Sequence, residues 1–158
     1  MTITDFFPGH PITSLAVLLG MATAIAPCFA AVTGKGYWQE SQSESCPGGA
    51  ICILDYSAVP VGKQVTIPSV SCAMTVNGPA IIKEVRLGSK NSNGNQQANL
   101  TYLTPTKNGV SGTFTYYSIN NSSVHILRSG DKANITVTFD SAPTGEIVKC
   151  TIGGIILD

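Results

Sequence analysis

The chain of 158 residues is 43% hydrophobic and only 11% charged, and its nine basic residues balance nine acidic ones. This length suits one ordinary domain, and this hydrophobicity without net charge predicts a packed core rather than disorder. The charged fraction lies well below the roughly 25% of typical soluble domains. No run of Lys and Arg is present to bind a phosphate backbone, which argues against a nucleic-acid partner.

An uncharged run from Leu15 to Ala26 dominates the N-terminal part of the chain. Small residues follow it at the positions that a signal peptidase reads, so we expect residues 1–30 to be a signal peptide cleaved after Ala30. The segment before the run has no Lys or Arg, which departs from the usual export signal. The run is shorter than the about 20 residues needed to cross a hydrocarbon core, so no transmembrane segment is expected.

Cys28 permits a rival interpretation, in which a lipid on this cysteine anchors the chain to a membrane. Bacterial lipoprotein signals carry a small residue immediately before that cysteine, whereas here Pro27 occupies the position. The sequence therefore favours a secreted or periplasmic protein over a lipoprotein.

Cleavage after Ala30 would leave an even set of four cysteines in an exported chain: Cys46, Cys52, Cys72 and Cys150. Such a set predicts two disulfides. Three pairings are possible, and spacing with strand parity favours Cys46 with Cys52 and Cys72 with Cys150. Zinc is not expected, because zinc sites usually draw on close pairs of Cys or His, and the gaps here are five, 19 and 77 residues.

Residues 31–48 show no periodicity and end in turn-forming residues, so we expect an irregular leader ahead of a domain at residues 49–158. From Gln64 onward, apolar residues recur at every second position in short runs separated by turn-formers. The runs predict strands at residues 70–76, 81–87, 100–102, 110–116, 124–126, 134–140 and 148–152, with an optional eighth at 50–56. We predict an all-β, single-domain, antiparallel two-sheet β-sandwich of jelly-roll-like or immunoglobulin-like topology, with an open barrel as the alternative.

Strand parity assigns individual side chains to the core or to solvent. It places Phe114 and Tyr116 in the core and Tyr117 outside. In the next run it places Val124 and Ile126 in the core and His125 outside. Cys72 and Cys150 both fall on core faces, which is the geometric reason for pairing them.

Exposed aromatic rings are candidates for stacking on sugars. We take Tyr37, Trp38 and Tyr117 as candidate ligand-binding residues, with the alternative that Trp38 packs as a lid over an open end of the sandwich. The polar stretch from Gly88 to Asn99 is expected to be a loop that is either mobile or a contact surface. Its amides suit sugar hydroxyls, and it has no carboxylate with which to bind calcium.

The sequence is poor in groups that catalyse reactions. His125 is the one histidine after residue 30, and no nucleophile-elbow, zinc-protease or phosphate-loop motif occurs. Asp131 and Asp140 are expected to stabilise turns at opposite ends of one strand. We therefore expect no enzyme, no cofactor and no metal; a hydrolase using His125 with Ser122 and Ser123 is the weaker alternative.

The leading prediction is a non-enzymatic, exported binding or surface-structural module stabilised by two disulfides. Its ligand class is left open, with carbohydrate and another protein at the cell surface as the two candidates. The alternative is a subunit that assembles with itself or with a partner chain through an edge strand at Ile152 to Leu157. Four sequons would carry glycans only in a source that glycosylates: Asn99, Asn120, Asn121 and Asn134.

Overall fold

A computed structural model of the chain describes residues 32–34 and 36–157. Within these residues the secondary structure consists of strands, turns and bends. The strands are β1 (Val32–Gly34), β2 (Tyr37–Glu44), β3 (Ile51–Ala58), β4 (Gln64–Asn77), β5 (Ile82–Lys90), β6 (Thr101–Leu103), β7 (Thr106–Ser111), β8 (Phe114–Leu127), β9 (Lys132–Phe139) and β10 (Gly145–Leu157). The predicted signal peptide, with Cys28, lies outside the described residues.

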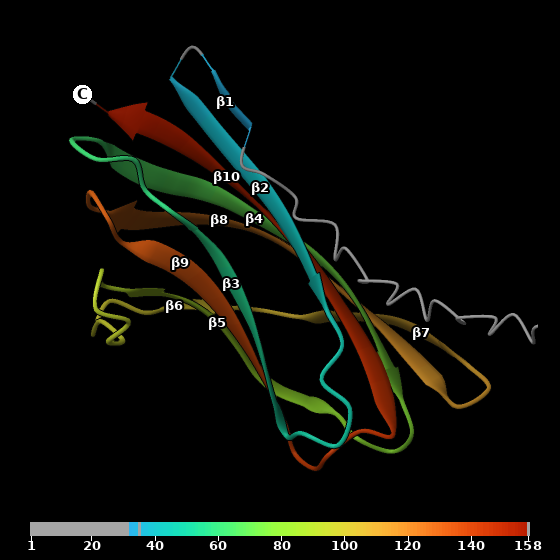
Figure 1. Cartoon of the computed structure of the whole chain (residues 1–158). Helices are drawn as coiled ribbons and strands as arrows, with labels where there is room; N and C mark the ends of the chain where they lie inside the picture. The colour runs from blue at the N-terminus through green and yellow to red at the C-terminus, as the bar shows by residue number, and fades with distance from the viewer. Residues whose placement is uncertain (1–31, 35, 158) are drawn as a thin grey trace, which may run out of the picture.

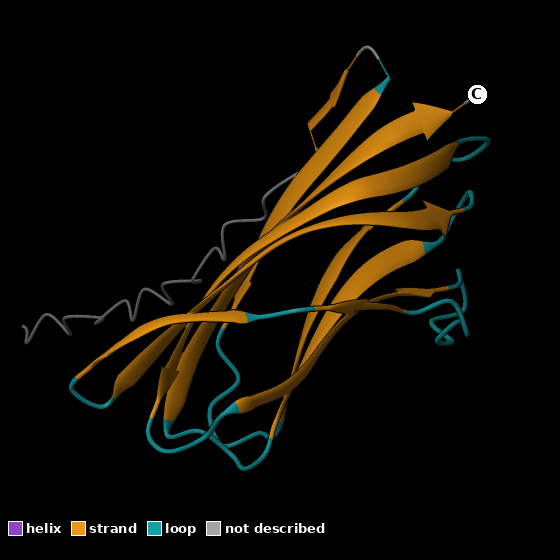
Figure 2. Ribbon diagram, turned by 180° about the vertical axis from the view of Figure 1, so that it is seen from behind, coloured by secondary structure: helices purple, strands orange, loops and turns teal. Residues whose placement is uncertain are grey.

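The strands form two antiparallel sheets that pack face to face as a β-sandwich (Figure 1). One sheet has the order β1-β2-β10-β4-β8-β7, and the other has the order β3-β9-β5-β6. Seen from behind, the two layers of strands are joined by loops at their ends (Figure 2). The predicted all-β, two-sheet fold is therefore confirmed.

Alternation of apolar and polar side chains explains most of the core between the sheets. In β9, Ile135, Val137 and Phe139 are buried against the opposite sheet, as their period of two predicts. The alternate residues Val70, Cys72, Met74 and Val76 of β4 and Val148, Cys150 and Ile152 of β10 are buried in the same way. β4, β9 and β10 thus each contribute an apolar face to a single core.

Both predicted disulfides are present. Cys72 and Cys150 lie directly opposite each other on the adjacent strands β4 and β10, and their bridge is enclosed in the core. Cys46 and Cys52 close a small ring in the connection from β2 to β3. In the chain-entropy account of disulfides the long ring stabilises the fold by roughly 4.5 kcal/mol and the short ring by roughly 2.4 kcal/mol. Two such bridges indicate folding in an oxidising compartment.

The expected irregular leader at residues 31–48 instead supplies β1 and β2, which corrects that prediction. β2 pairs with β10 from Tyr37 to Glu44, so this segment belongs to the sandwich. Trp38 and Glu40 face inward, whereas Tyr37 and Gln39 face outward. A glutamate on the inner face hides the apolar alternation by which strands are recognised.

The predicted orientation of the side chains in β8 is wrong by one residue. Residues 114–127 form one continuous strand instead of two, and its odd-numbered side chains point inward. Tyr117 is only 8% exposed and His125 is fully buried, whereas Phe114 and Tyr116 are exposed. Phe114 and Tyr116 are exposed because the even-numbered side chains of β8 lie on the outer face of the six-stranded sheet, away from the four-stranded sheet.

Two further segments differ from the sequence prediction. β5 continues to Lys90, so Gly88 and Ser89 are buried strand residues, and the loop begins only at residue 91. The apolar segment from Ile152 to Leu157 is not an edge, because β10 lies between β2 and β4. The hypothesis of assembly through this segment is therefore wrong, because it required a free edge strand.

Candidate functional site

Two register irregularities lie side by side in the six-stranded sheet, in the neighbouring pairs β10–β4 and β4–β8. The β10–β4 register shifts between Gly153 and Ile155, and the β4–β8 register shifts between Ile67 and Ser69, on either side of Pro68. Proline has no N–H to donate to a partner strand, which favours a bulge at that position. Bulges re-aim neighbouring side chains, and here they interrupt an otherwise regular outer face.

A groove with a volume of about 270 Å³ lies at these bulges. Its lining includes Tyr37, Gln39, Pro68, Ser69 and Gly153. Tyr37 is 68% exposed, so its ring is available to a ligand. A Cβ at Gly153 would lie 2.9 Å from Ser69 Oγ, so the serine hydroxyl packs against the glycine in the space that a side chain would need.

Trp38 supports this groove from the core. It is 1% exposed, and a Cβ on Gly154 would lie 3.1 Å from Trp38 Cε3 and 2.6 Å from Val65 Cγ1. The backbone at Gly154 therefore packs directly against the indole. Tyr37 therefore lies on the outer face, whereas Trp38 is buried beneath it, which corrects the prediction of Trp38 as an exposed ligand-binding ring.

The outer surface next to the groove carries hydroxyls and amides in cross-strand rows, with one charged side chain. We call this surface the hydroxyl face, and it comprises Gln39, Ser41, Ser43, Ser69, Ser71, Ser118, Asn120, Lys149 and Thr151. The Ser41 and Thr151 hydroxyls lie 2.7 Å apart, and Ser71 Oγ donates to Asn120 Oδ1 at 2.8 Å. These bonds hold the polar side chains in fixed orientations on the sheet.

Tyr117 and His125 do not join this site. Both side chains face the core from β8, and Thr101 Oγ1 lies 3.3 Å from His125 Nδ1. The other ring nitrogen, Nε2, is buried without a hydrogen-bond partner. Burial lowers the pKa of His125, while the negative charge of Asp131 acts in the opposite direction. A histidine enclosed in this way is not presented to a substrate.

Asp131 holds a turn, as predicted, whereas Asp140 links two connections that are distant in sequence. Asp131 Oδ2 accepts a 2.9 Å hydrogen bond from Arg128 N, and its Oδ1 accepts one from Gln97. Asp140 Oδ1 accepts a 2.9 Å bond from Ile81 N, and this bond lowers the pKa of Asp140. The two carboxylates thus make structural bonds at opposite ends of β9.

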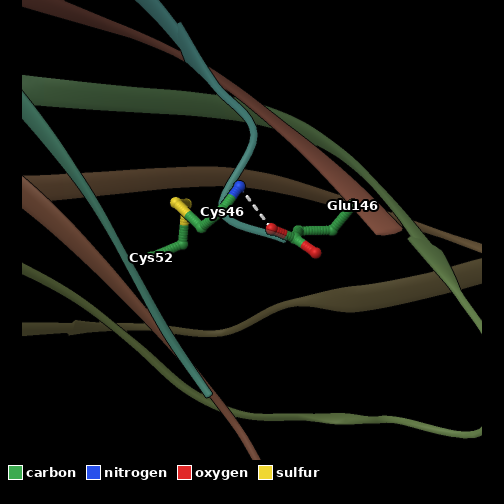
Figure 3. Close-up of side chains that lie close together, drawn as sticks. All are labelled: Cys46, Cys52 and Glu146. Atoms are coloured by element: carbon green, nitrogen blue, oxygen red, sulfur yellow. Dashed lines mark hydrogen bonds between the residues drawn. A yellow bond between two sulfur atoms is a disulfide. The ribbon is translucent and has the colours of Figure 1, made fainter. Parts of the chain in front are cut away.

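A second site, which the sequence pattern does not reveal, lies at the other end of β10. Cys46, Cys52 and Glu146 come together there, with one sulfur or oxygen atom of each within 4.8 Å of the others (Figure 3). Cys46 N donates a hydrogen bond to Glu146 Oε1, which joins residues 100 positions apart. Glu146 Oε2 is buried without a partner. A pocket of about 260 Å³ borders this segment, with Ser45, Phe114 and Glu146 in its lining.

The chain matches no protein-family model, and it has no detectable similarity to a curated protein. The described residues include no helix that is long and apolar enough to span a membrane. The groove and the cysteine–glutamate cluster are therefore interpreted from their own geometry.

Proposed function

We propose that the protein is an exported, non-enzymatic β-sandwich module that binds carbohydrate on the outer face of its six-stranded sheet. The observation that carries the proposal is the exposed ring of Tyr37 at the rim of a groove that continues into the hydroxyl face. Sugar rings present apolar C–H surfaces that stack on aromatic planes, and their hydroxyls pair with hydroxyl and amide groups. The site offers both kinds of contact.

The charge of the surface supports a neutral ligand. Lys149 is the one charged residue of the hydroxyl face, so an anionic polymer would find few cations there. The ordered hydroxyls also reduce the entropy lost on binding, because their side chains are already held by cross-strand bonds. We therefore favour an uncharged polysaccharide of the cell surface or its surroundings.

The positions of the reactive groups support the proposal of a non-enzymatic role. His125 is enclosed between the sheets, Asp131 holds a turn, and Asp140 links two connections. Export is supported by the two disulfides together with the apolar run near the N-terminus.

Affinity electrophoresis against a panel of neutral polysaccharides tests the proposal. Tyr37→Ala should weaken binding about tenfold, since it removes the stacking surface. Tyr102→Ala is the matched control, because Tyr102 is similarly exposed but lies on β6 of the other sheet. A second variant, Gly153→Ala, adds a methyl group beside Ser69 and should also weaken binding.

Two results would contradict the assignment. One is the absence of retardation of the wild-type protein by every polysaccharide in the panel. The other is an equal loss of binding in Tyr37→Ala and Tyr102→Ala, which would place the ligand elsewhere.

A further inference from the structure

The cluster of Cys46, Cys52 and Glu146 combines groups from three separate segments. Cys46 follows β2, Cys52 lies in β3, and Glu146 projects inward from the start of β10. Figure 3 shows the carboxylate directed towards the backbone of Cys46 beside the disulfide. The fold holds this carboxylate next to the two sulfurs through the pairing of β2 with β10.

The carboxylate of Glu146 is incompletely paired for a buried group. The residue is 4% exposed, yet only Oε1 accepts a hydrogen bond, while Oε2 has no partner. Buried carboxylates normally use both oxygens, because an unpaired one loses its hydration without replacement. The free oxygen is an independent indication that a donor or a cation belongs beside it.

Disulfide sulfurs are poor metal ligands, whereas two thiolates with a carboxylate form a donor set that Zn²⁺ accepts. We propose that reduction of the Cys46–Cys52 bridge converts this cluster into a Zn²⁺ site with Glu146 as the third protein ligand. Three protein ligands leave the fourth tetrahedral position to water. This inference is independent of carbohydrate binding on the outer face.

The redox step requires an external dithiol. Its thiolate attacks Cys46 Sγ and breaks the S–S bond, and Cys52 leaves as a thiol after taking up a proton. The second thiol of the reductant then releases Cys46 and closes the disulfide of the reductant, so two electrons and two protons have been transferred. Binding of Zn²⁺ displaces the two thiol protons and leaves both sulfurs as thiolates.

Access explains why this bridge is the one that opens. Cys46 is partly exposed, whereas Cys52, Cys72 and Cys150 are buried. Thiol–disulfide exchange needs an approach to one sulfur, which Cys46 provides and the bridge within the sheet does not. Two consecutive glycines in the ring, Gly48 and Gly49, allow its backbone to adjust around a metal.

Partial reduction followed by metal titration tests the site. The protein is treated with a phosphine reductant until two thiols per chain are labelled, and peptide mass mapping should assign them to Cys46 and Cys52. After the reductant is removed, Zn²⁺ is titrated in competition with a chromophoric chelator, and Cd²⁺ is titrated with detection of sulfur-to-cadmium absorbance. The reduced protein should bind one ion per chain, and the oxidised protein should bind none.

Substitutions distinguish loss of a zinc ligand from a general change in the charge of the protein. Glu146→Gln should weaken Zn²⁺ binding to the reduced protein by about tenfold or more. Glu44→Gln is the matched control, because this exposed carboxylate lies two residues before Cys46, and its loss should leave affinity unchanged. The double variant Cys46→Ser with Cys52→Ser should bind no ion after the same treatment.

The proposal is overturned if the reduced wild-type protein binds Zn²⁺ no better than the oxidised protein. It is equally overturned if Glu146→Gln matches the wild type, or if labelling finds Cys72 and Cys150 first. Near-ultraviolet circular dichroism is recorded throughout, and loss of the folded signal on reduction would also count against a site that depends on the fold.

Discussion

Two glutamates are buried in this protein, and their surroundings are opposite. The carboxylate of Glu40 accepts hydrogen bonds from Ser57 N, Ser57 Oγ and Gln42 Nε2 at 2.8 to 3.1 Å. The carboxylate of Glu146 accepts one bond, and its second oxygen is unpaired. Glu40 thus joins β2 of one sheet to β3 of the other, whereas Glu146 keeps one carboxylate oxygen that can accept a further hydrogen bond or bind a cation. A buried charge is structural where its partners are complete, and it suggests a ligand where they are not.

The largest effect is expected from Glu40→Ala. This change leaves the Ser57 N–H and hydroxyl without their acceptor at the junction of the sheets. We expect a loss of about 3 kcal/mol in the free energy of unfolding, measured by urea titration. Glu44→Ala, on the same strand but exposed, should change stability by less than about 0.5 kcal/mol. Equal effects of the two variants would show that the hydrogen bonds of Glu40 contribute no special stability, and would contradict its structural role.

The double variant Cys46→Ala with Cys52→Ala addresses the environment of Glu146. Opening the seven-residue ring should lower the free energy of unfolding by about 2 kcal/mol, because the unfolded chain regains entropy. Urea unfolding measures this loss. Hydrogen exchange at the backbone amide of residue 46 reports whether its hydrogen bond to the Glu146 carboxylate persists in the variant. Unchanged stability would show that the ring contributes little to the order of this end of the sandwich.

His125 is intermediate between Glu40 and Glu146 in how fully its polar atoms are paired. One ring nitrogen lies within hydrogen-bond distance of Thr101, and the other has no hydrogen-bond partner. Burial lowers its pKa in the folded state, so below about pH 6.5 the unfolded chain binds a proton that the fold excludes. Stability should therefore be fully present above that pH and fall as the pH decreases, by about 1.4 kcal/mol for each pH unit that separates the two pKa values. Urea midpoints from pH 4 to 8 measure the slope, which His125→Gln should reduce. An identical slope in the variant would assign the pH dependence to other groups.

The smallest effect on stability is expected from Glu146→Gln. The amide oxygen can still accept the bond from Cys46 N, and the substitution removes a buried charge that is only half paired. We expect the free energy of unfolding to stay within about 1 kcal/mol of the wild type by urea titration. A loss as large as that of Glu40→Ala would show that Glu146 is structural and would contradict the contrast between the two residues.

The sequence predicts strands well where one face alone is apolar. The odd residues of β9 and the even residues within 148–152 of β10 follow a strict period of two, and both strands and the Cys72–Cys150 bridge are confirmed. It fails in β8, where apolar side chains occur on both faces and a polar middle separates them. It also fails in β2, where an inward Glu40 looks like a surface residue until its partners in β3 are known.

The candidate sites were only partly predictable for the same physical reason. The aromatic ring of Tyr37 in a polar stretch makes it a candidate from sequence alone, whereas the groove beside it depends on two register shifts that coincide where β10, β4 and β8 lie side by side. Glu146 gave no local signal, because its proximity to Cys46 depends on strands paired across 100 residues of sequence. Contacts created by strand order cannot be deduced from short-range spacing.

The central position of β10 has a consequence for how the chain is made. Synthesis proceeds from the N-terminus, so β2 and β4 are complete long before the strand that joins them exists. Until residue 150 has been added, Cys72 has no correct partner, and it can be oxidised wrongly with Cys46 or Cys52. The six-stranded sheet can close only after β10 has been made, so the pairing of β2 and β4 through β10 comes after all the other strands have been synthesised.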